Sequence, residues 1–204
     1  MARESRPIVK LSRREGYALH PKAHKALVKR PTAPGQHGKS GQRNKPSQYA
    51  IQLREKQKVK RLYGLLERQF SKLMKEAERT KGQSGEVLLQ LLEQRLDNVI
   101  YRSGLAVSRP AARQLVTHGH FMLNDRRVDI PSIRVKIGDS ISLRSKSQKN
   151  EYFLKIDEIS PDAPNPAWLK VNRKKFEIQV SGVPSREDAE PDIKEQLIVE
   201  YYSR

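Results

Sequence analysis

The chain has 204 residues and a formal net charge of +18, with 41 Lys and Arg against 23 Asp and Glu. A compact protein of this charge repels itself unless a polyanion binds it, and nucleic acid is the usual polyanion. A soluble basic domain without such a partner is the simpler alternative. We see no long apolar run and no separate basic amphipathic helix, so no membrane partner is expected. The absence of cysteine excludes disulfides and Cys-ligated metal, and it is compatible with a reducing cytoplasm.

Positive charge concentrates in residues 1–45, which hold 12 Lys and Arg, only 2 Asp and Glu, and many Gly and Pro. Few apolar residues recur there with any period, so this stretch alone could not bury enough surface to offset its ordering entropy. We expect a basic extended N-terminal arm that is unstructured in the free protein and orders on RNA. A solvated, disordered tail is the alternative.

A helix is expected after Pro46, with Ser47 as its N-cap. Apolar residues then recur at spacings of three and four from Val59 to Ala77, which predicts one face of a single long helix that ends at Gly82. The early polar face of this helix is basic and carries Arg54, Lys56, Lys58, Lys60 and Arg61.

Two more helices are expected before the pattern changes. Ser84 is expected to cap a helix that runs to Gly104. Ser108 is expected to cap a short third helix, with Pro110 in its first turn and Gly119 at its end.

Beyond Gly119 the apolar period becomes two, which indicates short antiparallel strands. Asn124-Asp125 and Gly138-Asp139 are expected to form tight turns. Strands are expected at 121–123, 128–130, 133–135, 141–143, 152–156 and 176–180. The tail, residues 184–204, holds 6 Asp and Glu against 3 Lys and Arg, so it is expected to face basic protein and not RNA.

These elements predict an α+β protein: a basic extended N-terminal arm, a helical domain, and a compact RNA-binding domain of two helices packed on short antiparallel strands. The expected domains are a basic RNA-binding extension (1–45), a helical domain (46–93) joined by the C-terminal tail (184–204), and an RNA-binding domain (94–157) with a following strand segment (158–183).

The strongest candidate site is the third helix. Arg109 and Arg113 are four residues apart, so they stand on one helical face beside the helix N-terminus at Ser108. A turn at Gly119 would place the neighbouring hairpin alongside, giving a basic wall suited to RNA phosphates. Ordinary solvated charges are the alternative. We predict that changing both arginines to Ala weakens RNA binding by ~2–4 kcal/mol and leaves thermal stability almost unchanged.

Other motifs are weaker. His118-Gly119-His120 lacks a cysteine or a spaced carboxylate, so no metal is expected. Asp97 and Asp129 have no positioned catalytic partner, and Asp97 is expected to bond a neighbouring Arg or a backbone group. Residues 34–38 form a turn-rich loop without the Gly-Lys-Ser/Thr ending of a P-loop. We therefore expect no catalytic residue, no cofactor and no enzyme activity.

Several stretches resemble a known family. The motifs that resemble the RNA-binding domain named after small-subunit ribosomal protein four are Glu93–Arg102, Ser108-Arg109, Ala112–Val116 and His118–His120. Those that resemble the ribosomal protein four family itself are Pro34–Gly38, Glu55–Lys58, Tyr63-Gly64, Glu67–Phe70 and Ile193–Arg204. The resemblance runs in order from about residue 30 to the last residue, and the flanking stretches do not occur in enzymes that carry the domain alone.

The resemblance implies a structural constituent of the small ribosomal subunit in the cytoplasm. The family binds the 5′ domain of small-subunit ribosomal RNA, nucleates assembly of the subunit body, and with ribosomal protein five affects translational accuracy. With proteins three and five it lines the channel through which messenger RNA enters. An RNA-modifying enzyme, such as a pseudouridine synthase or a methyltransferase, and a small RNA chaperone are the rival interpretations.

Two features depart from the family. Many members have a Cys-rich zinc knot in the N-terminal arm, and this chain has no cysteine. The family hairpin usually has Gly after Asn, whereas this chain has Asn124-Asp125-Arg126; Asp tolerates a left-handed conformation well enough for the turn to survive.

The residues expected to contact ribosomal RNA are basic or polar and belong to the arm, the first long helix and the third helix with its hairpin. They are Arg3, Arg13, Arg14, Lys22, Lys25, Lys29, Arg30, Gln36, His37, Lys39, Arg43, Lys45, Arg54, Lys56, Lys58, Lys60, Arg61, Arg68, Ser108, Arg109, Arg113, His118, Gly119, His120, Asn124, Arg126 and Arg127.

Overall fold

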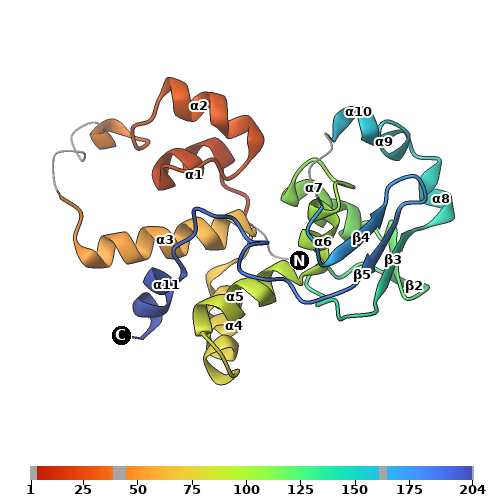
Figure 1. Cartoon of the computed structure of the whole chain (residues 1–204). Coiled ribbons are helices and arrows are strands. Elements are labelled where there is room, and N and C mark those ends of the chain that lie inside the picture. Colours follow the sequence, from red (N-terminus) through yellow and green to blue (C-terminus); the bar gives the residue numbers. More distant parts are fainter. Residues whose placement is uncertain (1–3, 39–44, 161–164, 204) are drawn as a thin grey trace. The chain divides into compact units, whose positions relative to one another are not determined.

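The structure is a computed structural model that describes residues 4–38, 45–160 and 165–203. The chain forms two compact units (Figure 1): a helical unit of residues 1–88 with 191–204, and a sheet unit of residues 89–190. Helices and a five-stranded antiparallel sheet together confirm the expected α+β class. None of the helices in these ranges is long and apolar enough to cross a membrane.

The N-terminal segment differs from the extended arm that its composition predicts. It contains α1 (Ile8–Glu15), the 3-10 turn η1 (Pro21–Ala23), α2 (His24–Lys29) and the 3-10 turn η2 (Gln36–Gly38). Leu11, Leu19 and Ala23 are buried, and α1 packs against both α2 and α3 (Gln48–Leu62). Only a few apolar residues are needed because a neighbouring helix supplies the other half of the core.

Ser47 caps α3 as expected, since its hydroxyl accepts a hydrogen bond from the Ala50 amide (3.3 Å). The prediction of one continuous helix to Gly82 is wrong. The chain turns at Gly64, which has a φ of 65°, and α4 (Glu67–Arg79) begins afresh. The apolar spacing continues across this break, and both α3 and α4 have buried apolar residues, so periodicity alone could not locate it.

The second expected helix is also two helices, α5 (Ser84–Glu93) and α6 (Leu96–Arg102). Between them Arg95 is extended and forms a single β-bridge with Arg134. This bridge is all that forms of the strand predicted at 133–135. In the helical unit, α11 (Glu195–Tyr202) packs along α3.

The sheet unit follows the expected order more closely. Helix α7 (Arg109–Thr117) begins at the Ser108 cap with Pro110 in its first turn, and it packs on α6. The strands are β1 (Phe121–Leu123), β2 (Arg126–Val128), β3 (Ser140–Leu143), β4 (Leu169–Asn172) and β5 (Glu177–Val180), in the sheet order β2-β1-β3-β5-β4. All pairs are antiparallel, and Ile141 faces Leu123 on one side and Ile178 on the other.

The strand expected at 152–156 is wrong, because this segment is helical. Three one-turn helices follow β3: α8 (Ser145–Gln148), α9 (Glu151–Leu154) and α10 (Ile156–Ile159). The Asn150 side chain accepts a hydrogen bond from the Tyr152 amide (3.3 Å), which caps α9. Phe153 is then buried in the core with Phe121 and Ile141, so the apolar pattern reports burial and not a strand. Strand β4 is an element that the sequence did not predict.

Candidate RNA interface

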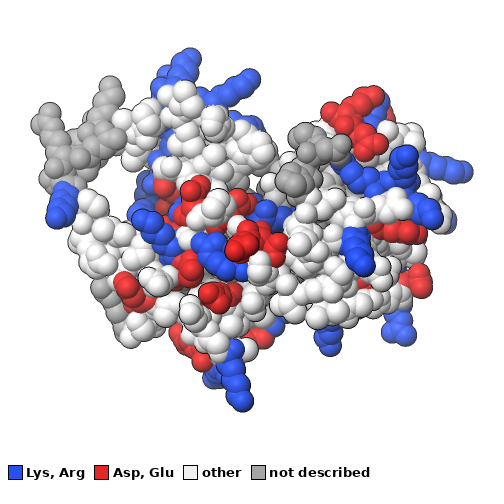
Figure 2. Space-filling model, in the orientation of Figure 1, with Lys and Arg blue, Asp and Glu red and all other residues white. Residues whose placement is uncertain are grey.

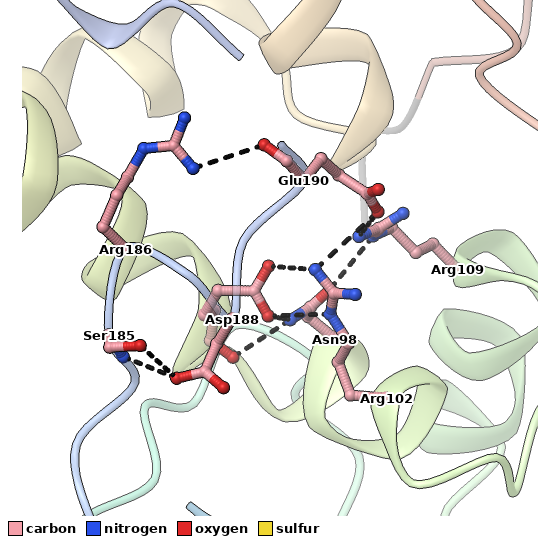
Figure 3. A network of polar contacts seen from close by, with 8 residues as sticks. Asn98, Arg102, Arg109, Ser185, Arg186, Asp188 and Glu190 are labelled. Carbon is pink, nitrogen blue, oxygen red and sulfur yellow. Dashed lines mark hydrogen bonds and ion pairs between the residues drawn. The ribbon is translucent and has the colours of Figure 1, made fainter. Parts of the chain in front are cut away.

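Helix α7 holds its two candidate arginines in internal contacts. Arg109 Nε donates to Asn98 Oδ1 (3.0 Å), and Arg109 Nη2 donates to Glu190 Oε1 (3.0 Å), as Figure 3 shows. The guanidinium also lies 4.5 Å from the centre of the Tyr101 ring. Arg113 Nη1 donates to Asp97 Oδ2 (3.0 Å).

These contacts correct the expectation that Arg109 and Arg113 stand exposed on a basic wall. Their side chains are only 11% and 13% exposed. The prediction that Asp97 bonds a neighbouring Arg is confirmed, since it pairs with both Arg95 and Arg113. Ser108 is buried as well, and its hydroxyl accepts from the Ala111 amide (3.3 Å). The polar residues on this face of α7 therefore form hydrogen bonds and ion pairs within the protein.

A second cluster, which we call the Gly119 patch, consists of His118, Gly119, His120, Arg127 and Arg144. Gly119 ends α7 with a φ of 71°, and a Cβ there would lie 2.6 Å from Arg127 Nε. Only glycine lets the Arg127 side chain lie so close to the backbone. Arg144 Nη1 donates to the Gly119 carbonyl (3.1 Å), and the Arg144 amide donates to the His120 carbonyl (3.0 Å).

The Gly119 patch is open and positively charged. His118 and Arg127 are exposed and Arg144 is half-buried, and within the described ranges no carboxylate forms an ion pair with either arginine. Burial, His118 and Arg144 together lower the pKa of His120 below its ordinary value. The His120 Nδ1 lies 3.0 Å from Ser147 Oγ, which fixes the ring.

Basic residues of α8 extend the patch, and the sequence analysis did not include them among the expected RNA contacts. Because Ser147 contacts His120, α8 lies beside the patch, and it carries the exposed Lys146 with Lys149 directly after it. Arg126 is also exposed on β2, but successive strand residues point to opposite faces of the sheet, so it is not part of the patch. The signal in the sequence is the run from Arg144 to Lys149, which has three basic and no acidic residues directly after a strand.

The hairpin tip between β1 and β2 is held firmly. Asn124 and Asp125 have φ values of 49° and 63°, as a two-residue hairpin turn requires. Asn124 Nδ2 donates to Asp139 Oδ1 (2.8 Å), and its Oδ1 accepts from the Ser140 amide (2.9 Å). The turn therefore forms with Asp125 where the resembling family usually has Gly, and the Asn124 side chain stabilises it.

In the helical unit, the basic face of α3 is paired internally and is not an open surface. Arg54 and Arg61 both form ion pairs with Glu15, whose side chain is fully buried. Burial raises the pKa of Glu15 above its ordinary value, although both arginines oppose this shift. Lys58 pairs with Glu55 (2.8 Å) and donates to the Asp192 carbonyl (2.7 Å).

Glu67, the first residue of α4, receives the other two α3 cations. Lys56 Nζ donates to one of its carboxylate oxygens (2.8 Å), and Lys60 Nζ donates to the other (2.9 Å). Tyr202 of α11 adds a third hydrogen bond (2.8 Å). Burial alone would raise the pKa of Glu67, but these three donors outweigh it and lower the pKa to about 2. Burial and the contact with Glu67 raise the pKa of Tyr202.

Exposed cations of the helical unit lie in its N-terminal segment, where Figure 2 shows blue side chains standing out around α2, and also along α4. Arg13 is an exception, since its Nε donates to the carbonyls of Arg30 and Thr32 (3.2 Å each). The predicted RNA-contacting residues that are exposed in this unit are Arg14, Lys22, Lys25, Lys29, Arg30, Gln36, His37, Lys45 and Arg68. Three others, Arg3, Lys39 and Arg43, lie outside the described residues.

Comparison with known proteins decides the family. Residues 3–93 match the family described as ribosomal protein S4/S9 N-terminal domain, and residues 94–141 match the S4 domain. The chain is 51% identical over its full length to all of "Small ribosomal subunit protein uS4" of Herpetosiphon aurantiacus. The proteins of the same name from Clostridioides difficile and Roseiflexus castenholzii are 50% and 48% identical, again over both full chains. The chain belongs to the uS4 family.

This result confirms the resemblance found in the sequence and the expectation that the chain is not an enzyme, because its uS4 relatives are ribosomal proteins. In the uS4 chain the S4-domain match covers α6, α7 and the first two strands, which include the Gly119 patch except Arg144. Among residues 4–38, 45–160 and 165–203, no three His, Cys, Asp or Glu side chains gather closely enough to hold a metal ion.

Proposed function

We propose that this uS4 chain is a structural constituent of the small ribosomal subunit that binds the 5′ domain of its ribosomal RNA and helps nucleate assembly of the subunit body in the cytoplasm. The full-length similarity to proteins named for that subunit carries the proposal. The charge of +18 supports it, because so basic a protein needs a polyanion.

The Gly119 patch is the best candidate for the RNA contact of the sheet unit. Its two guanidinium groups converge on one turn, and no carboxylate in the described part of the chain neutralises them. Structured RNA offers backbone phosphates more readily than base edges, because its deep major groove hides the bases. Guanidinium groups bind such phosphates with paired hydrogen bonds. We place phosphate contacts on Arg127 and Arg144, with Lys146 and Lys149 at the margin.

The exposed cations of the N-terminal segment provide the second RNA contact in this proposal. They are separate from Lys56, Lys60 and Arg61 of α3, whose charges are already matched by Glu67 and Glu15. In this proposal the α3 cations stabilise the helical unit, and the exposed cations of the N-terminal segment bind the RNA.

The proposed protein partners follow from the family resemblance and from the charge of the tail. Residues 184–204 carry six acidic and three basic side chains, an exception in so basic a chain. An acidic segment suits a basic protein better than RNA. We place ribosomal protein five there, with an effect on translational accuracy, and protein three and messenger RNA at the channel through which the messenger enters.

A titration with RNA fragments tests the proposal. The full chain should bind a fragment of the 5′ domain much more tightly than a 3′-domain fragment of equal length. Changing Arg127 and Arg144 together to Gln should weaken that binding about tenfold or more and make the salt slope shallower by about 2. The matched control changes Lys174 and Lys175 to Gln, since both are exposed cations of the same unit outside the patch.

The outcome has a clear reading. An equal loss in the control would show that net charge alone drives binding and that the Gly119 patch has no particular role. Equal affinity for the 5′ and 3′ fragments would contradict the proposed binding site on the ribosomal RNA.

A further inference from the structure

Two arginines of the sheet unit, Arg102 and Arg109, converge on the carboxylate of Glu190, as Figure 3 shows. Arg109 Nη2 lies 3.0 Å from Glu190 Oε1, and Arg102 Nη2 lies 3.7 Å from the same oxygen. The side chains are 11%, 19% and 22% exposed for Arg109, Arg102 and Glu190 respectively. One acidic group, still reached by solvent, therefore occupies the space between two cations.

Other residues hold the two arginines in place. Arg102 Nε and Nη2 donate to the two carboxylate oxygens of Glu93, which is fully buried, at 3.0 and 2.9 Å. Arg109 Nε donates to Asn98 Oδ1 at 3.0 Å. Because none of these bonds involves Glu190, they persist when its side chain moves away. The two guanidinium groups then form a preorganised anion site.

Glu190 comes from a turn that is stabilised by its own contacts. The Ser185 amide and hydroxyl both donate to Asp188 Oδ2, at 2.7 and 2.9 Å. The Ala189 amide donates to the Arg186 carbonyl (3.3 Å), and Arg186 Nη1 donates to the Glu190 carbonyl (3.4 Å). All of these bonds use backbone groups or other side chains. The Glu190 carboxylate can therefore rotate away while the turn keeps its shape.

We infer that Arg102 and Arg109 form a binding site for a backbone phosphate of RNA, and that Glu190 occupies it as an intramolecular competitor until RNA displaces it. A carboxylate and a phosphate present similar paired oxygens to a guanidinium group, so one can replace the other. The exchange also keeps an anion beside both arginines throughout. This inference rests on the proposed function, because it takes RNA as the ligand.

The test compares Glu190→Gln with Glu187→Gln in a titration of the full chain with the 5′-domain fragment. Glu187 is an exposed carboxylate of the same turn, so its change removes the same charge without opening the arginine site. At 0.15 M salt, exposed charges separated by more than about 8 Å are largely screened. Glu190→Gln should tighten binding about twofold to fivefold, the factor for an ion pair of ~0.4–1 kcal/mol, and Glu187→Gln should leave it nearly unchanged.

A double variant locates the effect. Arg109→Gln should weaken RNA binding, and adding Glu190→Gln to it should bring back little or none of the gain. Thermal melts of each free variant show whether it is folded at the titration temperature. If Glu190→Gln is not, Glu190→Asp replaces it; this keeps the charge one methylene farther back and should give a smaller gain of the same sign.

Two failures remain distinguishable. If the unchanged protein does not bind the 5′-domain fragment, the proposed function itself fails. If it binds, but the Glu190 variant binds no tighter than the Glu187 variant, or the gain persists without Arg109, the inferred competition is overturned while the proposed function stands.

Discussion

Replacing Glu67 by Gln should destabilise the helical unit more than any change to an exposed charge. The Glu67 carboxylate joins three helices, because it accepts hydrogen bonds from Lys56 and Lys60 of α3 and from Tyr202 of α11 while it begins α4. The two lysine side chains are only 3% and 9% exposed. Removing the charge therefore leaves two mostly buried ammonium groups without their counter-ion.

The expected cost is about 2 kcal/mol. Two charge-assisted hydrogen bonds contribute roughly 1.5–3 kcal/mol each when fully buried. The Glu67 side chain is 46% exposed, so solvent screening reduces this sum, and the amide oxygen of Gln still accepts one bond. Urea unfolding at pH 7 measures the loss. Glu78→Gln is the matched control, since Glu78 is an exposed carboxylate of the same helix.

The pH dependence gives a second check. In the folded protein the pKa of Glu67 is about 2, below its ordinary value of 4.5. A lowered pKa means that the carboxylate stabilises the fold fully above about pH 4.5 and loses that contribution as the pH falls toward 2. The stability difference between the unchanged protein and Glu67→Gln should shrink over that range. Equal stability of the Glu67 and Glu78 variants at pH 7, or a pH-independent difference, would refute the reasoning.

Three further predictions follow from other contacts. Arg113→Ala should lower the free energy of unfolding by about 1–2 kcal/mol in urea, because Asp97 is buried and loses an ion pair, whereas a truly exposed arginine would cost almost nothing. Asp125→Gly should raise it by about 0.5 kcal/mol, because Asp125 has a φ of 63°; a loss of stability would mean that the Asp side chain holds the turn. For binding of the unchanged protein to the 5′-domain fragment, the logarithm of the association constant should fall with the logarithm of the salt concentration at a slope of about −6 to −7 if ~8 phosphates are contacted. A slope shallower than about −2 would exclude charge as the main source of affinity.

The elements that the sequence predicted correctly have local causes. Ser47 and Ser108 cap their helices with their own hydroxyls, and the Asn124-Asp125 turn follows from residues that tolerate positive φ. Each of these features is decided within four residues, so the sequence alone identifies it.

The elements that were missed lie where the apolar pattern fits more than one secondary structure. The apolar period continues from α3 into α4 and gives no sign of the break at Gly64, where the backbone turns with a positive φ. Phe153 alternates like a strand residue, yet Asn150 caps a helix there and the ring packs on the sheet core. In both places the apolar pattern reports which residues are buried and does not by itself decide the secondary structure.

The candidate site was predictable in part. A turn at Gly119 was expected to bring the neighbouring hairpin alongside, and in the structure Arg127 of that hairpin lies against Gly119. The sequence could not show which basic residues of α3 and α7 are paired, because some of their counter-ions are far away along the chain: Glu15 lies 46 residues before Arg61, and Glu190 lies 81 residues after Arg109. An excess of positive charge in the sequence shows that counter-ions are needed, but only the fold shows which cations are paired within the protein and which remain exposed.

Sucrose-gradient fractionation of cell extract tests the central claim most directly. The protein should sediment with the small subunit at one copy per subunit and stay there after a wash in moderate salt, as a structural constituent does. Protein found mainly at the top of the gradient, or well below one copy per small subunit after that wash, would contradict the account.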